Sequence, residues 1–283
     1  MGPKKTICYA RDRMKSNFSL AFLVLPKPQR KALTTLYRFC RTVDDIVDHA
    51  KEVGQAQVKL DHWKEVLERL PNPSLFDPIE AHQLAQTLRD FPIEREDLHW
   101  IIEGVETDLK KNRYQTFEEL LTYCDGVASS VGLVCLAIFE ADRRKTLPYA
   151  FAMGRALQLT NILRDIASDA QRGRIYIPLV DLERFGYRER HLLISIYDER
   201  FVELMKFQVN RVKTFYTQAK NSLSAKDRAL LPACEIMRKT YESLLLRIEA
   251  CQYNIFPKRI RISTARKMAV AMSVWAPRLL RAS

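Results

Sequence analysis

Apolar residues recur at every third or fourth position along almost the whole chain, which is the spacing of amphipathic helices. Proline and glycine interrupt this pattern around residues 71–78, 92, 173–178 and 257. A capping box of Thr116 and Glu119 marks one helix start. The pattern predicts helices over residues 30–48, 55–70, 79–89, 94–110, 116–140, 146–169, 179–185, 196–223 and 225–253, and a basic helix after residue 257.

Turn residues are sparse, since the chain has only 8 glycines among 283 residues, and this disfavours a β-sandwich or barrel. The 47% hydrophobic and 28% charged residues are typical of an ordinary soluble globular protein. No segment has the composition of a flexible linker, and no internal repeat is visible. We therefore expect one all-α domain that spans residues 1–283.

The six cysteines are scattered and show no C-x-x-C spacing, so neither a zinc site nor a redox motif is indicated. Free thiols in apolar runs suit a reducing compartment, and we expect a cytoplasmic protein. The longest uncharged run, residues 126–139, is shorter than the roughly 20 residues of a membrane-spanning helix. We therefore do not expect an integral membrane protein.

The net charge of +12 indicates either an anionic partner, which can be nucleic acid, a membrane surface or the substrate, or simply a solvated basic surface, since basic residues are spread along the whole chain. Residues 258–283 contain seven Lys or Arg and no acid, interleaved with apolar residues. Such a helix either lies on a membrane interface, as a peripheral contact, or packs on the bundle with its basic face in water. No zinc-finger or RNA-binding aromatic signature accompanies the charge, so we expect no nucleic-acid partner.

The first predicted helix carries a narrow polar stripe. At about 100° per residue, Tyr37, Arg41, Asp44 and Asp48 lie at roughly 0°, 40°, 340° and 20°, and apolar residues cover most of the remaining surface. A helix that is apolar nearly all round is buried. Buried carboxylates are costly unless they are paired or bind a metal, and two Asp one turn apart suit Mg²⁺.

A second stripe lies on the helix predicted over residues 146–169. With Gln158 at zero, Asn161, Asp165 and Asp169 lie at about 300°, 340° and 20°, again among apolar neighbours. A single D-x-x-x-D pattern on a helix is most often a solvated face. Two of them, each in apolar sequence with Arg nearby, point instead to one cavity that holds a metal-bridged diphosphate, with cationic and phenolic groups supplied by residues 172–178.

These motifs resemble those of the squalene and phytoene synthase family. The resemblance covers nearly the whole chain, and it includes both Asp-rich motifs in order. It rests on Phe18-Ser-Leu-Ala-Phe22, Asp44-Asp45-Ile-Val-Asp48, Tyr123-Cys-Asp-Gly-Val127-Ala128, Asn161-Ile-Leu-Arg164-Asp165-Ile-Ala-Ser-Asp169 and Arg174-Ile-Tyr176-Ile-Pro178. It implies the isoprenoid synthase fold, a single helical bundle around a central cavity, and a Mg²⁺-dependent transferase in which Mn²⁺ can substitute.

The resemblance also implies roles for individual residues. Mg²⁺ and the diphosphates would be held by Asp44, Asp48, Asn161, Asp165 and Asp169. Arg41 and Arg164 would neutralise phosphate charge, and the site would be lined by Tyr37, Gln158, Tyr123 and Tyr176. Val127 and Ala128 would border the channel for the prenyl tails. The family often has Ser-x-Ser before the first Phe, where this chain has Lys15 and Asn17, so the phosphate contact expected at Asn17 is altered.

The implied reaction ionises one allylic diphosphate, and the double bond of the second substrate attacks the cation to give a cyclopropylcarbinyl diphosphate. Residues 102–109 and 172–178 look most like bacterial presqualene diphosphate synthases of hopanoid pathways, which use farnesyl diphosphate and need no NADPH for this step. The alternatives are a phytoene synthase that uses geranylgeranyl diphosphate, a non-catalytic assembly factor of the same fold, and a terpene cyclase.

Other charged residues favour structural interpretations. Glu103, Glu106 and Asp108 are predicted to form a solvated helix face, and the five histidines show no metal-ligand spacing.

Overall fold

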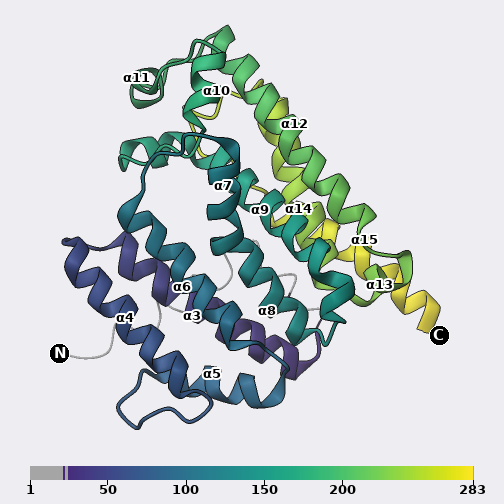
Figure 1. Ribbon diagram of the computed structural model, residues 1–283. Helices are drawn as coiled ribbons and strands as arrows, with labels where there is room; N and C mark the ends of the chain where they lie inside the picture. Colours follow the sequence, from purple (N-terminus) through teal and green to yellow (C-terminus); the bar gives the residue numbers. More distant parts are fainter. Residues whose placement is uncertain (1–21, 23–24, 283) are drawn as a thin grey trace, which may run out of the picture.

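The computed structural model describes residue 22 and residues 25–282, and over these residues it contains helices and no β-strand (Figure 1). This confirms the predicted all-α fold. The elements are α3 (Lys27–Asp48), α4 (Val53–Arg69), α5 (Ile79–Asp90), α6 (Arg95–Lys110), α7 (Phe117–Cys124), the π-helix η1 (Asp125–Ser129), α8 (Ser130–Ile138), α9 (Arg143–Gln171), α10 (Leu179–Arg184), α11 (Glu189–Leu193), α12 (Glu199–Asn221), α13 (Ala225–Leu230), α14 (Pro232–Ala250) and α15 (Thr264–Ala282).

The continuous stretch α7–η1–α8 lies at the centre of the bundle and packs against α6 and α9 (Figure 1). On one side α4 and α5 cover α6 and α3, and on the other side α12 and α14 cover α9. The two helices with the Asp-rich stripes, α3 and α9, therefore belong to the interior layers. Their stripes can face a shared space only because this packing brings them to the same end of the central helix.

Two close backbone approaches hold η1 between its neighbours. A Cβ at Gly104 of α6 would lie 2.3 Å from the backbone carbon of Gly126, and one at Gly154 of α9 would lie 2.5 Å from Cα of Ser129. Side chains at either glycine would push the helices apart. The prediction of one uniform helix over residues 116–140 therefore needs correction, because its middle turn is π-helical.

Most predicted helices agree with the structure to within a few residues, and local capping explains several starts. Thr116 Oγ1 accepts a hydrogen bond from the Glu119 backbone N–H, as the capping box predicts. The single helix predicted over residues 225–253 is wrong. The chain breaks at Leu231, and Pro232 starts α14, because proline fits the first turn of a helix but not its interior. The short helix α11 was not predicted.

Within the described residues, Phe117–Ile138 is long and apolar enough, by length and composition, to cross a membrane. However, 56% of its most apolar window is buried inside the bundle. Central helices of globular bundles have the same composition, because they are covered by protein on all sides. The position of this stretch between α6 and α9 accounts for its apolar character.

Candidate active site

The two stripes face one cavity of about 280 Å³. It is lined from α3, α6, α7, α9 and the loop that follows α9. The lining residues are Asp44, Val47, Asp48, Val105, Asp108, Tyr123, Gln158, Asn161, Ile162, Arg164, Asp165, Asp169, Arg172, Arg174 and Tyr176. The five side chains predicted to hold metal and diphosphate are all among them. The arrangement juxtaposes two sets of oxygen donors with a group of arginines.

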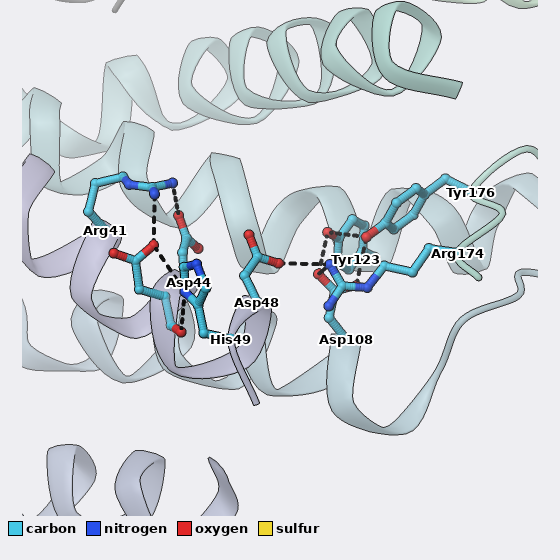
Figure 2. Close-up of polar contacts among 9 residues, drawn as sticks. Arg41, Asp44, Asp48, His49, Asp108, Tyr123, Arg174 and Tyr176 are labelled. Atoms are coloured by element: carbon cyan, nitrogen blue, oxygen red, sulfur yellow. Dashed lines mark hydrogen bonds and ion pairs between the residues drawn. The ribbon is translucent and has the colours of Figure 1, made fainter. Parts of the chain in front are cut away.

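The α3 side of the cavity presents Asp44 and Asp48, one helical turn apart (Figure 2). Asp48 accepts a hydrogen bond from Arg174 Nη1 at 3.0 Å, so this carboxylate is already tied to the loop after α9. Arg41 instead points along the helix to Asp45, with Nη2 2.7 Å from Oδ1, and its side chain is half exposed. In this arrangement Arg41 does not line the cavity.

The α9 side presents Asn161, Asp165 and Asp169. The Asp165 carboxylate is held by two guanidinium groups: Arg164 donates to both oxygens, and Arg259 donates to both at 2.7 Å. Burial raises the pKa of this carboxyl, but the two arginines outweigh burial and bring the pKa below its usual range. Asp165 is therefore an anion at neutral pH.

Asp44 and Asp169 are less fully compensated: Asp44 has one distant ion pair, with Arg41 Nη1 4.0 Å from its Oδ2, and Asp169 is only near the charges of Arg172 and Arg174. Burial raises the pKa of each carboxyl to about 7, and neighbouring carboxylates add to the effect, Asp48 at the first and Asp165 at the second. A cation that entered between them would lower the pKa of both carboxyls and so favour their ionised form. Two poorly compensated carboxyls on opposite helices are the electrostatic signature of a cation site.

A third group forms the end of the cavity away from Arg41 (Figure 2). The Asp108 carboxylate accepts hydrogen bonds from the hydroxyls of Tyr123 at 3.0 Å and Tyr176 at 2.9 Å, and Arg174 Nη1 lies 4.0 Å away. The two phenol rings stack with their centroids 5.2 Å apart. Arg174 thus connects the α3 carboxylate Asp48 to this network.

The prediction of a solvated face on α6 is wrong for two of its three residues. Asp108 lines the cavity, and Glu106 is buried, with its carboxylate bound by Lys64 at 2.6 Å and by Lys110. Glu103 is exposed as expected. Lys110 lies on α6 itself, one turn after Glu106, but Lys64, Tyr123 and Tyr176 come from other parts of the chain, so the pattern of α6 contained no sign of these three.

The remaining predicted residues lie as follows. Gln158, Arg164, Tyr123 and Tyr176 line the cavity with the five metal-site candidates. Tyr37, Val127 and Ala128 are partly buried on α3 and η1, and together with Arg41 they are not among the residues that line it. Asn17 lies outside the described residues.

A family model described as squalene/phytoene synthase matches residues 12–266. The chain belongs to the squalene/phytoene synthase family. Among relatives, the 15-cis-phytoene synthase of Synechocystis sp. is 36% identical over 270 residues, which are 91% of this chain and 80% of the relative. The phytoene synthase of Arthrospira platensis is 38% identical over 264 residues, which are 89% of this chain and 85% of the relative.

Solved structures of family members have the same architecture. A dehydrosqualene synthase in complex with a ligand superposes with a TM-score of 0.80 and 27% identity, covering 98% of this chain and 96% of that one. The squalene synthase HpnC from Alicyclobacillus acidocaldarius gives 0.77 and 27%, covering 88% and 94%. These findings confirm the predicted family and the isoprenoid synthase fold.

The residues of this family member fit a hard divalent cation. Asn161 Oδ1 is buried without a hydrogen-bond partner, while its Nδ2 faces Gln158 Oε1 at 3.5 Å, so the amide oxygen is left for a ligand. Amide and carboxylate oxygens are the donors that Mg²⁺ prefers. Among the described residues, no three acidic, His or Cys side chains are grouped closely enough to hold a metal by themselves. The donors on α3 and α9 instead face each other across the space that a diphosphate would bridge.

Sequence reasoning missed one residue that lines the cavity, Asp108, and one that binds a lining carboxylate, Arg259. Asp108 was assigned to a solvated face, and Arg259 was treated only as part of the basic carboxyl-terminal segment. The signal for Asp108 was its place one turn after Gly104 and Val105, on a side of the helix that is otherwise apolar. Arg259 carries no local signal, because its partner Asp165 lies 94 residues earlier in the chain.

Proposed function

We propose that this protein is a metal-dependent prenyltransferase that joins two allylic prenyl diphosphates head to head. The observation that supports this most strongly is the pairing of Asp44 and Asp48 on α3 with Asn161, Asp165 and Asp169 on α9 around one arginine-lined cavity. Two diphosphates bring several negative charges, and these need divalent cations and guanidinium groups together.

The first candidate substrate is geranylgeranyl diphosphate, with phytoene as the product. Its support is that the two cyanobacterial relatives at 36% and 38% identity both carry the name phytoene synthase. Phytoene synthesis, which was an alternative in the sequence analysis, therefore takes precedence over presqualene diphosphate synthesis.

Farnesyl diphosphate with presqualene diphosphate as product is the second candidate. It is favoured by the resemblance of residues 102–109 and 172–178 to presqualene diphosphate synthases and by the squalene-type names of the two solved structures. Neither candidate needs NADPH for the first condensation. In both we place the protein in the cytoplasm, with its substrates drawn from the membrane or from solution.

In the proposed mechanism bound Mg²⁺, or Mn²⁺ in its place, would supply the positive charge that stabilises the departing diphosphate. Asp44, Asp48, Asn161, Asp165 and Asp169 would hold the ions. Arg164, Arg172 and Arg174 would face the phosphate oxygens, where their fixed donors stabilise the developing charge. The hydroxyls of Tyr123 and Tyr176 donate to Asp108, and their stacked rings would form an aromatic wall on the carbocation side of the cavity.

The test is product analysis with purified protein and Mg²⁺, using farnesyl or geranylgeranyl diphosphate, with NADPH first omitted and then added. Phytoene from the geranylgeranyl substrate supports the first candidate, and presqualene diphosphate from the farnesyl substrate, unchanged by NADPH, supports the second. If neither substrate turns over and Asp44→Ala behaves as wild type, the enzyme proposal fails. The assembly-factor interpretation would then replace it.

A further inference from the structure

The terminal helix α15 has an unusual distribution of polar and apolar side chains. Its inner side packs against α14 and includes Val270, which is 6% exposed, and Lys267, which is 9% exposed. Its outer side carries Met268, Met272 and Trp275, which are 50%, 53% and 38% exposed. At about 100° per residue these three side chains lie within roughly 60° of one another, and Ala265 and Ala269 are also exposed.

A helix on the surface of a bundle normally turns its polar side to water and its apolar side inward. In α15 the outer side is apolar over three successive turns, and a lysine is on the packed side. Single exposed apolar residues need no explanation, but a continuous stripe marks a contact surface. The flanking exposed side chains Lys258, Arg261 and Arg266 are basic, and residues 250–283 contain no acid.

We propose that the outer face of α15, formed by Met268, Met272 and Trp275, binds the surface of a membrane that contains anionic lipids. An apolar stripe flanked by cations is the pattern of a helix that lies in the interface, with lysines and arginines at the headgroups. Trp275 suits this depth, because its indole combines a large apolar surface with one N–H donor.

The charge of this segment argues against a second copy of the chain as the partner that covers the outer face of α15. Residues 258–283 bring seven Lys or Arg and no acid, so two copies that met through α15 would place like charges together. An anionic lipid surface has the opposite charge, and it attracts such segments by about 1 kcal/mol per basic residue near the surface. An anionic membrane is therefore the partner that can both bury the apolar stripe and attract the basic residues beside it.

The docking helix is also joined directly to the cavity. Arg259, five residues before the start of α15, holds Asp165 inside the site. A helix lying on a membrane would thus keep this wall of the cavity close to the lipid surface. This consequence rests on the proposed function, since prenyl tails concentrate in membranes, but the docking itself does not.

The experiment measures binding of the full-length protein to vesicles in the absence of any prenyl substrate. Vesicles of phosphatidylcholine alone are compared with vesicles that also contain phosphatidylglycerol, by co-sedimentation and by tryptophan fluorescence. Wild type is expected to bind the anionic vesicles at least tenfold more tightly, with a blue shift that disappears in Trp275→Phe. Added salt is expected to weaken the binding.

Met272→Glu is expected to reduce this binding at least tenfold. Val58→Glu is the matched control, because Val58 is 69% exposed on α4, which Figure 1 shows on the opposite side of the bundle from α15, and it is expected to bind as wild type. Circular dichroism and thermal melts show that both variants are folded.

Equal loss of vesicle binding in the two variants, absence of binding by wild type, or a wild-type dimer that Met272→Glu dissociates would each overturn the proposal. Turnover of detergent-solubilised substrate is measured separately, so a failure of docking and a failure of the proposed activity are distinguishable.

Discussion

At the scale of single residues, Asp44 and Asp169 determine how the cavity responds to pH. The pKa of each carboxyl is raised to about 7, mainly by burial, whereas an aspartate in an unfolded chain has a pKa of about 4. Between these values the unfolded chain has released the proton and the folded chain has kept it. The free energy of unfolding therefore falls as pH rises from about 4 to about 7. A bound cation would offset this loss, because it stabilises the two carboxyls in their ionised form.

This gives a prediction for metal binding. Mg²⁺ with inorganic pyrophosphate should raise the melting temperature strongly at pH 8, where both carboxyls are ionised, and little at pH 5.5, where cations must displace two protons. The measurement is a thermal melt with and without the ligands at each pH. The double variant Asp44→Asn/Asp169→Asn should lose the pH 8 shift, and an equal shift at both pH values would contradict the role given to these carboxyls.

Asp108 and Glu103 lie on the same helix and make a matched pair for a second prediction. Asp108→Asn removes the charge that two phenols and Arg174 face, so we expect stability to fall by about 1–3 kcal/mol. We expect kcat/KM to fall at least tenfold, because Arg174 is then held at the cavity by Asp48 alone and the two phenols lose their charged acceptor. Glu103→Gln, on the exposed face, should change stability by less than about 0.5 kcal/mol and leave kcat/KM unaltered.

Urea unfolding and steady-state kinetics on the two variants make this comparison. If both behave alike, the original interpretation of Asp108 as part of a solvated face is restored.

At the scale of elements, the π-turn η1 is the piece that most depends on close packing. It lies between α6 and α9, and it carries Val127 and Ala128, the residues assigned to the tail channel. Asp125 at its start is 8% exposed and is bound through two oxygens by Arg155 of α9, at 2.8 and 2.6 Å. This ion pair and the glycine contacts together fix where the turn lies.

Gly104→Ala tests that packing. The new methyl group would lie 2.3 Å from the Gly126 backbone, which cannot move without shifting α6 or η1, so we expect a loss of about 1–3 kcal/mol or more. Gly54→Ala is the control, since no atom lies within 4 Å of its Cβ and its helix should gain about 0.5–1 kcal/mol. Urea unfolding of both variants gives the two values, and a stability gain in Gly104→Ala would show that α6 and η1 are not in contact.

At the scale of the whole molecule, the helical spacing of apolar residues predicted the architecture because nearly every helix buries one face. The two Asp stripes were visible for the same reason, since each is a polar strip on a helix that is otherwise apolar. What the sequence could not predict depends on tertiary neighbours. The hydrogen-bond shift of η1 leaves no compositional trace, and Arg259 meets Asp165 across 94 residues. The break at Leu231 is different, because its cause, Pro232, is visible in the sequence.

Net charge is also a property of the whole molecule, and it yields the last prediction. The protein carries +12, yet the cavity is lined by five Asp and three Arg, so the field that attracts an anionic substrate must come from the rest of the surface. The Debye length shortens from about 30 Å at 0.01 M salt to about 8 Å at 0.15 M, which screens that distant charge.

We therefore expect kcat/KM for the prenyl diphosphate to fall about tenfold over this range of salt concentration, because association slows, while kcat stays constant. The inhibition constant of the corresponding uncharged prenyl alcohol is the control, and it should not change. A kcat/KM that is insensitive to salt would mean that the basic surface does not serve the substrate, and that its charge is directed to another partner.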